Sequence, residues 1–216
     1  MRLLIMGAPG AGKGTQATLI KEFYNIPHIS TGDMFRQAMA SGSNLGVLAK
    51  SYIDKGNLVP DDVTIGIVRD RLKEDDCKKG FLLDGFPRTI DQAIALDKIL
   101  TELNVKLDGV INIAVEDSAL IARISGRRIC PNCGASFHVV TCKPKVDGIC
   151  DECGHELIQR DDDKEETLKV RLENYYKKTE PVLSYYEKQG LVKNIWGMGD
   201  IKQIFASITN VLGESK

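Results

Sequence analysis

The 216-residue sequence predicts an α/β fold of three layers, in which helices cover both faces of a mainly parallel sheet. Short apolar segments alternate with longer amphipathic segments along the chain, as strands alternate with helices in such folds. The length suits one buried core with modest insertions. Hydrophobic residues make up 43% and charged residues 27% of the chain, which are the proportions of an ordinary globular protein.

The first predicted elements flank a glycine-rich loop. The run "RLLIM" over 2–6 is typical of a buried strand, and it ends directly at Gly7. The segment 13–24 after the loop has apolar residues at helical spacing, so a helix is expected there. A second strand-to-helix junction is expected within 26–39. Three polar residues could cap its helix: Ser30, Thr31 and Asp33.

The middle of the chain continues the alternation. Two amphipathic stretches, 46–55 and 61–72, predict helices. A short apolar strand then ends at Asp84, and Gly and Pro residues separate it from a helix over about 90–103. The apolar run 108–115 predicts another buried strand.

The last third begins with a predicted helix over 117–125, followed by a cysteine-rich region. The segment 161–178 has an acidic first turn that suits a helix N-terminus, and Pro181 should end or kink that helix. The run 191–196 predicts the last strand. Apolar residues at helical spacing mark the final helix: Ile201, Ile204, Phe205, Ile208, Val211 and Leu212.

The charge balance restricts the classes of partner. The 29 basic and 30 acidic residues nearly cancel, so neither nucleic acid nor an anionic membrane surface is expected as a partner. The apolar run 3–6 is too short for a signal-peptide core, and no run approaches membrane-spanning length. A cytoplasmic location is expected.

The glycine loop carries the first functional motif. Residues 7–13 fit GxxxxGK, in which backbone N–H groups surround phosphate oxygens at a helix N-terminus and Lys13 adds a positive charge. The bland alternative is a plain turn with an exposed lysine. Gly14 stands where Ser or Thr usually follows the lysine, with Thr15 one place later, so direct ligation of magnesium by a hydroxyl is in doubt.

Three polar segments should meet in one crevice. The glycine loop, 30–33 and 84–88 each follow a predicted strand. Ligands of parallel α/β sheets bind at the carboxyl ends of the strands. These segments are therefore the candidate binding site.

The cysteine region predicts a structural zinc site. Four cysteines have the spacing C-x2-C-x16-C-x2-C, and each pair is followed by glycine: Cys130, Cys133, Cys150 and Cys153. Four thiolates in tetrahedral geometry leave no open position for catalysis. A redox CxxC pair and unrelated core thiols are the alternatives. The nearby donors His138, Cys142 and His155 are expected to be unliganded.

Four segments closely resemble the adenylate kinase family, in order and with matching spacing: "GAPGAGKGTQA", "HISTGDMFR", "GFLLDGFPRT" and "RDDDKEETLKVRL". The resemblance spans essentially the whole chain. It implies reversible phosphoryl transfer from ATP to AMP, giving two ADP, with magnesium and in a monomer. It also implies three regions: a P-loop core over 1–29, 60–126 and 164–216, a helical segment that binds AMP over 30–59, and a small zinc-ribbon lid over 127–163.

The resemblance assigns roles to individual residues. The expected catalytic residues are Lys13, Arg88, Arg127, Arg160 and Arg171. The ATP-binding set is Gly10, Ala11, Gly12, Lys13, Gly14, Thr15, Arg127, Ser136, Phe137 and Gly199. The AMP-binding set is Thr31, Arg36, Asn57, Leu58, Val59, Gly85, Phe86, Pro87, Arg88, Gln92, Arg160 and Arg171. Asp84 is expected to hold magnesium through water. Arg123 and Arg128 match no assigned position and are expected to be solvated.

Several of these assignments have local alternatives. Gln92 could cap its own helix with Thr89, as in a TxxQ capping box, instead of reading the adenine edge. Asp84 could be a turn-forming aspartate. Phe137 could stack on adenine or pack inside the ribbon. The family pattern also implies a cis bond between Phe86 and Pro87.

Other functions compete with this interpretation. The nearest is a UMP/CMP kinase, although Thr31 and Gln92 favour adenine. A zinc-ribbon nucleic-acid protein with a P-loop ATPase core is disfavoured by the near-neutral charge and by acidic ribbon residues: Asp147, Asp151, Glu152 and Glu156. A catalytically silent zinc protein is disfavoured by Lys13 and the arginine set. The zinc ribbon is expected to stiffen a lid that closes over ATP and excludes water.

Overall fold

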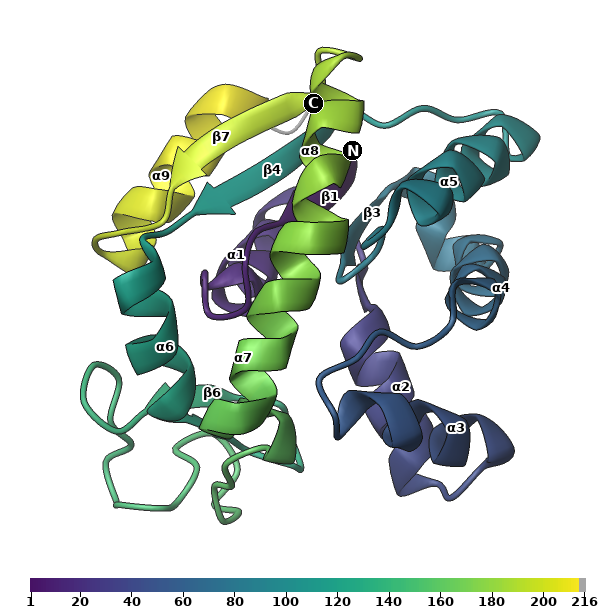
Figure 1. Ribbon diagram of the computed structural model, residues 1–216. Coiled ribbons are helices and arrows are strands. Elements are labelled where there is room, and N and C mark those ends of the chain that lie inside the picture. The colour runs from purple at the N-terminus through teal and green to yellow at the C-terminus, as the bar shows by residue number, and fades with distance from the viewer. Residues whose placement is uncertain (214–216) are drawn as a thin grey trace.

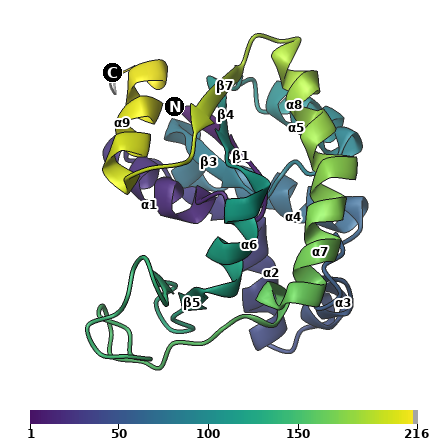
Figure 2. The same ribbon diagram turned by 60° about the vertical axis from the view of Figure 1, so that its left-hand side comes forward.

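The computed structural model describes residues 1–213 and confirms the three-layer α/β fold (Figures 1 and 2). A five-stranded sheet has the order β2-β3-β1-β4-β7, and all of its neighbouring strands pair in parallel. Its strands are β1 (Arg2–Met6), β2 (His28–Ser30), β3 (Phe81–Asp84), β4 (Gly109–Ala114) and β7 (Val192–Trp196). Among residues 1–213, no helix has both the length and the apolar character that crossing a bilayer requires.

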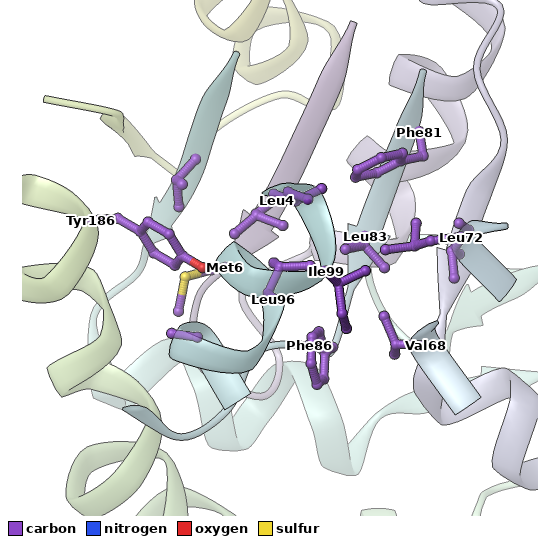
Figure 3. Close-up of a cluster of buried hydrophobic side chains, with 14 of the residues drawn as sticks. Leu4, Met6, Val68, Leu72, Phe81, Leu83, Phe86, Leu96, Ile99 and Tyr186 are labelled. Atoms are coloured by element: carbon purple, nitrogen blue, oxygen red, sulfur yellow. The ribbon is translucent and has the colours of Figure 1, made fainter. Parts of the chain in front are cut away.

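Helices cover both faces of this sheet because alternate strand residues point to opposite sides. Leu4 and Met6 face one cluster with helices α4, α5 and α8, which Figure 3 shows. Leu3 and Ile5 face the other cluster with α1, α6 and α9. The bounds of these helices are α1 (Lys13–Tyr24), α4 (Asp61–Leu72), α5 (Ile90–Glu102), α6 (Asp117–Ser125), α8 (Glu180–Glu187) and α9 (Ile201–Leu212). A 3-10 turn, η1 (Asp75–Lys79), precedes β3.

Helices α2 (Thr31–Ala40) and α3 (Asn44–Ile53) form a hairpin with a small apolar cluster of its own. The cap of α2 is Ser30, whose hydroxyl accepts a hydrogen bond from the Asp33 N–H, so Thr31 and Asp33 lie inside the helix. Helix α3 begins two residues before the predicted start. The reason is a cap at Ser43, whose hydroxyl accepts from the Gly46 N–H.

The cysteine region folds as a small ribbon at the end of the molecule where α2 and α3 also lie (Figures 1 and 2). Strands β5 (Arg127–Ile129) and β6 (Ser136–His138) pair in antiparallel fashion. The buried centre of the ribbon consists of Cys130, Phe137, Cys150 and Leu157. This cluster is far too small to be a stable core without further support.

The chain leaves the ribbon through the 3-10 turn η2 (Asp161–Asp163) and enters a long helical run. This run consists of α7 (Glu165–Asn174), the π turn η3 (Tyr175–Thr179) and α8, and it is continuous in Figure 1. The helical run therefore does not end at Pro181. The proline lies in the first turn of α8, directly after the wider π turn, where its missing N–H costs little.

Candidate active site

The glycine loop joins β1 to α1 at the carboxyl end of the sheet. Gly7, Gly10 and Gly12 have φ angles of 142°, 85° and 96°, which glycine adopts far more readily than other residues. A Cβ atom on Gly7 would lie 2.6 Å from the Ile113 carbonyl oxygen, so the loop also needs a bare backbone there. Because α1 begins at Lys13 directly after this loop, the free N–H groups of its first turn are donors that suit an anion.

Lys13 closes over this loop. Its Nζ donates to the carbonyl oxygens of Gly7 (2.7 Å) and Ala8 (2.9 Å). Burial lowers the pKa of Lys13 to about 8, and the positive charges of Arg88 and Arg171 add to this effect, whereas Asp84 opposes it. Gly14 and Thr15 follow on the exposed first turn of α1. A lysine in this state is a poorly solvated cation that a phosphate would stabilise.

Asp84 lies beside the glycine loop because β3 pairs with β1 in the register Ile5 to Asp84. Its Oδ2 is 3.4 Å from the His28 Nε2. Burial by itself would raise the pKa of Asp84, but the His28 contact and the charge of Lys13 outweigh it, so the pKa is lowered. The carboxylate is therefore ionised and suits a hydrated magnesium ion.

The loop after β3 carries Arg88. The bond between Phe86 and Pro87 is cis. The Arg88 Nε donates to the Gly85 carbonyl oxygen (2.8 Å), and the same oxygen accepts from the Thr31 hydroxyl (2.9 Å). Burial lowers the pKa of Arg88, and the charge of Arg171 lowers it further. Arg88 thus faces the other cations of the site.

A buried carboxylate, Asp163, holds two further arginines. It has no exposed surface, and its two oxygens accept from the Nε (2.9 Å) and NH2 (2.5 Å) of Arg127. Arg171 NH1 donates to the same carboxylate (3.0 Å). The sequence predicts only an acidic helix start for Asp161–Asp163, so this role of Asp163 was not expected. The bond to Arg127 joins segments 36 positions apart and leaves no local pattern in the sequence.

The other two arginines are Arg36 on α2 and Arg160 at the end of the ribbon. The Asp33 Oδ1 accepts from Arg36 NH2 (2.6 Å) and lies 4.0 Å from Arg160 NH2. Burial lowers the pKa of Arg160 to about 10, and the neighbouring charges of Arg36 and Arg127 contribute. The Asp33 carboxylate thus binds Arg36 and lies beside Arg160, a cation from a different region.

Gln92 takes part in the cap of its own helix, which was the alternative to a role at the adenine edge. Its side chain is 2% exposed, its N–H donates to the Thr89 hydroxyl, and its Oε1 accepts from the Arg88 N–H (2.7 Å). Its Nε2 donates to Asp61 (2.7 Å). This arrangement is a helix cap, and it also places Gln92 beside the loop of Arg88. A role at the adenine edge remains a prediction.

Several of the predicted site residues line one cleft. It lies between the glycine loop, the loop after β3, the segment after α3 and the helix α7, and it is lined among others by Lys13, Leu58, Gly85, Arg88 and Arg171. Asn57 lies at its edge through a contact with Asn174. Val59 is buried in the cluster of α2 and α3.

The predicted ATP-side residues of the ribbon and of the loop after β7 lie outside this cleft. Phe137 is 8% exposed and packs inside the ribbon, and Ser136 beside it is exposed. Gly199 lies in the loop between β7 and α9 with a φ angle of 127°. Arg123 was expected to be solvated, but its NH2 donates to the Gly197 carbonyl oxygen (3.0 Å) of this loop. Arg128 binds the carbonyl oxygens of its own turn.

The four cysteine sulfur atoms fit a tetrahedral metal ion. All four lie within 4.8 Å of one another, with Cys130 3.4 Å from Cys153 and Cys133 3.5 Å from Cys150. A tetrahedral ion with Zn–S bonds of ~2.3 Å separates its sulfurs by ~3.8 Å, which is close to these distances. The backbone N–H of His155 lowers the pKa of Cys153, whereas, against the lowering effect of the Ala135 backbone, desolvation and hydrogen bonds to the other three sulfurs raise the pKa of Cys133.

Two of the nearby donors, His138 and Cys142, lie outside the sulfur cluster. The Nδ1 of His138 accepts from the N–H groups of Val140 and Thr141, both at 3.1 Å. Its Nε2 lies 3.1 Å from the Ala122 carbonyl oxygen on α6. Cys142 is exposed and outside the sulfur cluster. These positions agree with the expectation that the cluster consists of the four cysteines.

Comparison with known proteins agrees with this geometry. A family model described as adenylate kinase matches residues 5–191. A protein named adenylate kinase from Geobacillus sp. (strain WCH70) is 59% identical over 213 residues, which cover 99% of each chain. Another from Acetivibrio thermocellus is 56% identical over 216 residues and covers both chains completely. A third, from Caldanaerobacter subterraneus subsp. tengcongensis, is 57% identical over 212 residues, which cover 98% of this chain and 96% of the relative. The chain belongs to the adenylate kinase family.

Proposed function

We propose that this chain transfers a phosphoryl group reversibly from ATP to AMP and forms two molecules of ADP. The observation that carries the proposal is the convergence of cationic side chains on the carboxyl end of the sheet. These side chains are Lys13, Arg36, Arg88, Arg127, Arg160 and Arg171. Several of them lower the pKa of one another, which is the signature of a site that is completed by polyanions.

The proposed chemistry needs alignment and charge stabilisation. The attacking oxygen belongs to the AMP phosphate, which is already anionic near neutral pH, so no general base is required. The glycine loop and Lys13 would hold the ATP phosphates. Arg88 and Arg36 would hold the AMP phosphate, and Arg127, Arg160 and Arg171 would stabilise charge on the transferred group. Arginine forks suit this task because they bind phosphate oxygens in pairs.

Two metal ions belong to the proposal. Magnesium, bound with the nucleotide, would neutralise part of the negative charge of the phosphates. Asp84 is the ionised carboxylate that would hold it through water. Zinc would be held by the four cysteines of the ribbon and would have a structural role, since all four of its positions are filled by protein.

We further propose a division of labour within a monomer. The core over 1–29, 60–126 and 164–216 would hold the glycine loop. The segment 30–59 would bind AMP, and the ribbon over 127–163 would close over ATP. Closure would exclude water, which competes with AMP as an acceptor of the phosphoryl group.

The decisive test is the choice of acceptor. Purified protein is mixed with MgATP and with AMP, CMP, UMP or GMP in turn, and diphosphate formation is followed by chromatography. We expect the highest kcat/KM for AMP. A preference for CMP or UMP would support the alternative of a pyrimidine nucleotide kinase. Absence of transfer to all four acceptors would contradict the proposed activity.

A further inference from the structure

One face of the helical run α7, η3 and α8 lines the cleft, through Arg171, Asn174, Tyr175 and Thr179. In an uninterrupted α-helix, the face of Arg171 would continue at the i+3, i+4, i+7 and i+8 positions, which would bring both Lys178 and Thr179 near the cleft. The π turn, closed by the bond from the Glu180 N–H to the Tyr175 carbonyl oxygen, accommodates one additional residue. Thr179 is therefore buried at the cleft and Lys178 is exposed.

Asn174 ties the segment after α3 to this helix. Its Nδ2 donates to the Gly56 carbonyl oxygen (3.1 Å) and to the Asn57 Oδ1 (3.3 Å). The two segments are in close contact at this point. A Cβ atom on Gly56 would lie 2.7 Å from the Thr167 carbonyl oxygen and 3.2 Å from the Arg171 Cγ. The start of the segment 57–59 is thus seated directly on α7.

Thr179 ties the loop after β3 to the same helix. Its hydroxyl donates to the Arg88 carbonyl oxygen (3.0 Å). The Arg88 N–H is engaged on its other side by the Gln92 Oε1 (2.7 Å). Both main-chain groups of Arg88 are therefore held, while its guanidinium faces the cleft.

We propose that Asn174 and Thr179 are positioning residues of the acceptor-nucleotide site. The inference rests on the proposed function, which assigns 57–59 and Arg88 to AMP. Asn174 and Thr179 hold these two walls of the site at a fixed distance from Arg171, on one rigid helix. Without these bonds, the walls are ordered only when AMP arrives, and part of the binding free energy is lost to that ordering.

Two substitutions of similar shape test the inference. Asn174→Leu and Thr179→Val each remove the hydrogen-bond donor and keep the approximate volume. We expect each to raise the KM for AMP by about tenfold, the effect of one lost hydrogen bond. The KM for ATP and the kcat at saturating AMP should stay within about twofold of the parent values, since the donors do not bind the ATP side. Thr179→Ser retains the hydroxyl and should keep the KM for AMP.

Gln189→Leu is the matched control. It removes an amide that binds Asp97 (3.3 Å) beyond the end of α8, and we expect it to change neither KM. Calorimetric titration with AMP alone measures the same affinity in the folded fraction, so partial misfolding does not obscure the result. Unchanged AMP affinity in both variants overturns the inference, as does an equal rise of both KM values. A parent protein that does not phosphorylate AMP contradicts the proposed function itself.

Discussion

The cations of the candidate site are half-buried and lie close enough to repel one another. Lys13 illustrates the consequence, because burial and the neighbouring arginines together lower its pKa to about 8. Carboxylates offset part of this repulsion: Asp84 beside Lys13, Asp33 between Arg36 and Arg160, and Asp163 between Arg127 and Arg171. Each of these carboxylates has a lowered pKa. The residues are therefore preorganised for a ligand with several negative charges.

ATP binding should be accompanied by proton uptake near pH 8. At this pH Lys13 is about half protonated in the free protein, and a bound phosphate raises its pKa toward the normal value. We expect an uptake of about 0.5 proton per ATP at pH 8, and little at pH 6, where Lys13 is already protonated. Calorimetry in two buffers of different ionisation enthalpy measures this number. Lys13→Arg keeps a permanent charge and should abolish the uptake; an equal uptake in this variant would contradict the assignment.

Asp163→Asn should destabilise the protein, because it leaves the two arginines without their buried partner. We expect a loss of about 3 kcal/mol in the free energy of unfolding at pH 7 and a Tm lower by about 10 °C. The lowered pKa of Asp163 means that its contribution is complete above pH ~4 and is lost as the pH falls through the folded-state pKa. The difference between parent and variant in urea unfolding should therefore shrink in acid.

Asp161→Asn is the control for this substitution. Asp161 pairs with Lys164 on the surface, where both side chains are largely exposed, so its loss should leave the stability unchanged within error. Equal destabilisation by the two variants would show that Asp163 has no special role.

At the scale of elements, the ribbon and the helical run α7 to α8 depend on different forces. The ribbon has a buried cluster of only four residues, so we expect a metal ion bound by its cysteines to supply most of its order. The helical run is anchored along its length, by Arg171 to Asp163, by Asn174 to Gly56 and by Thr179 to Arg88. Its π turn contains Thr179, the last of these anchors, and buries that residue at the cleft.

Removal of zinc should unfold the ribbon and leave the sheet intact. We expect one zinc per chain by metal analysis. Cys150→Ser should lose zinc and become sensitive to limited proteolysis between about 130 and 157, while the far-ultraviolet circular dichroism of the core persists. Cys142→Ser, outside the cluster, should retain zinc and resist proteolysis. Parent protein without zinc, or a protease-resistant Cys150→Ser variant, would contradict a structural metal site.

At the scale of the whole molecule, stability and chemistry reside in different places. The two apolar clusters on the faces of the sheet contain the largest buried side chains, and the candidate site lies at the carboxyl ends of the strands. Figures 1 and 2 show the ribbon and the hairpin of α2 and α3 beyond the carboxyl ends of the strands. A change deep in the sheet should therefore affect unfolding more than catalysis.

Leu96→Ala tests this separation. Leu96 is fully buried between α5 and the sheet, so the cavity should cost about 3 kcal/mol of unfolding free energy and lower the Tm by about 6–12 °C. The KM values for ATP and AMP at 25 °C should not change, because Leu96 does not line the cleft. A large change in either KM would show that the core and the site are coupled.

Features that depend on local pattern could be predicted from the order of residues alone. The strand 2–6, the glycine loop and the cysteine spacing could be predicted, because periodicity, backbone freedom and ligand spacing are properties of neighbouring residues. Local pattern was misleading at two positions. The helical run was expected to end or kink at Pro181, but a π turn lets it continue. The start of α3 lies two residues before the predicted one because Ser43 caps the helix.

Contacts between residues that are far apart in the sequence depend on the packing of the folded chain. Asp163 binds Arg127 across 36 positions, Arg123 reaches Gly197 across 74, and Asn174 reaches Gly56 across 118. These pairs leave no periodic signal, because each depends on how the sheet order and the helical run bring separate segments to the same edge. The side chain of a residue determines which chemistry it can perform, whereas the packing of the whole chain determines which partner it contacts.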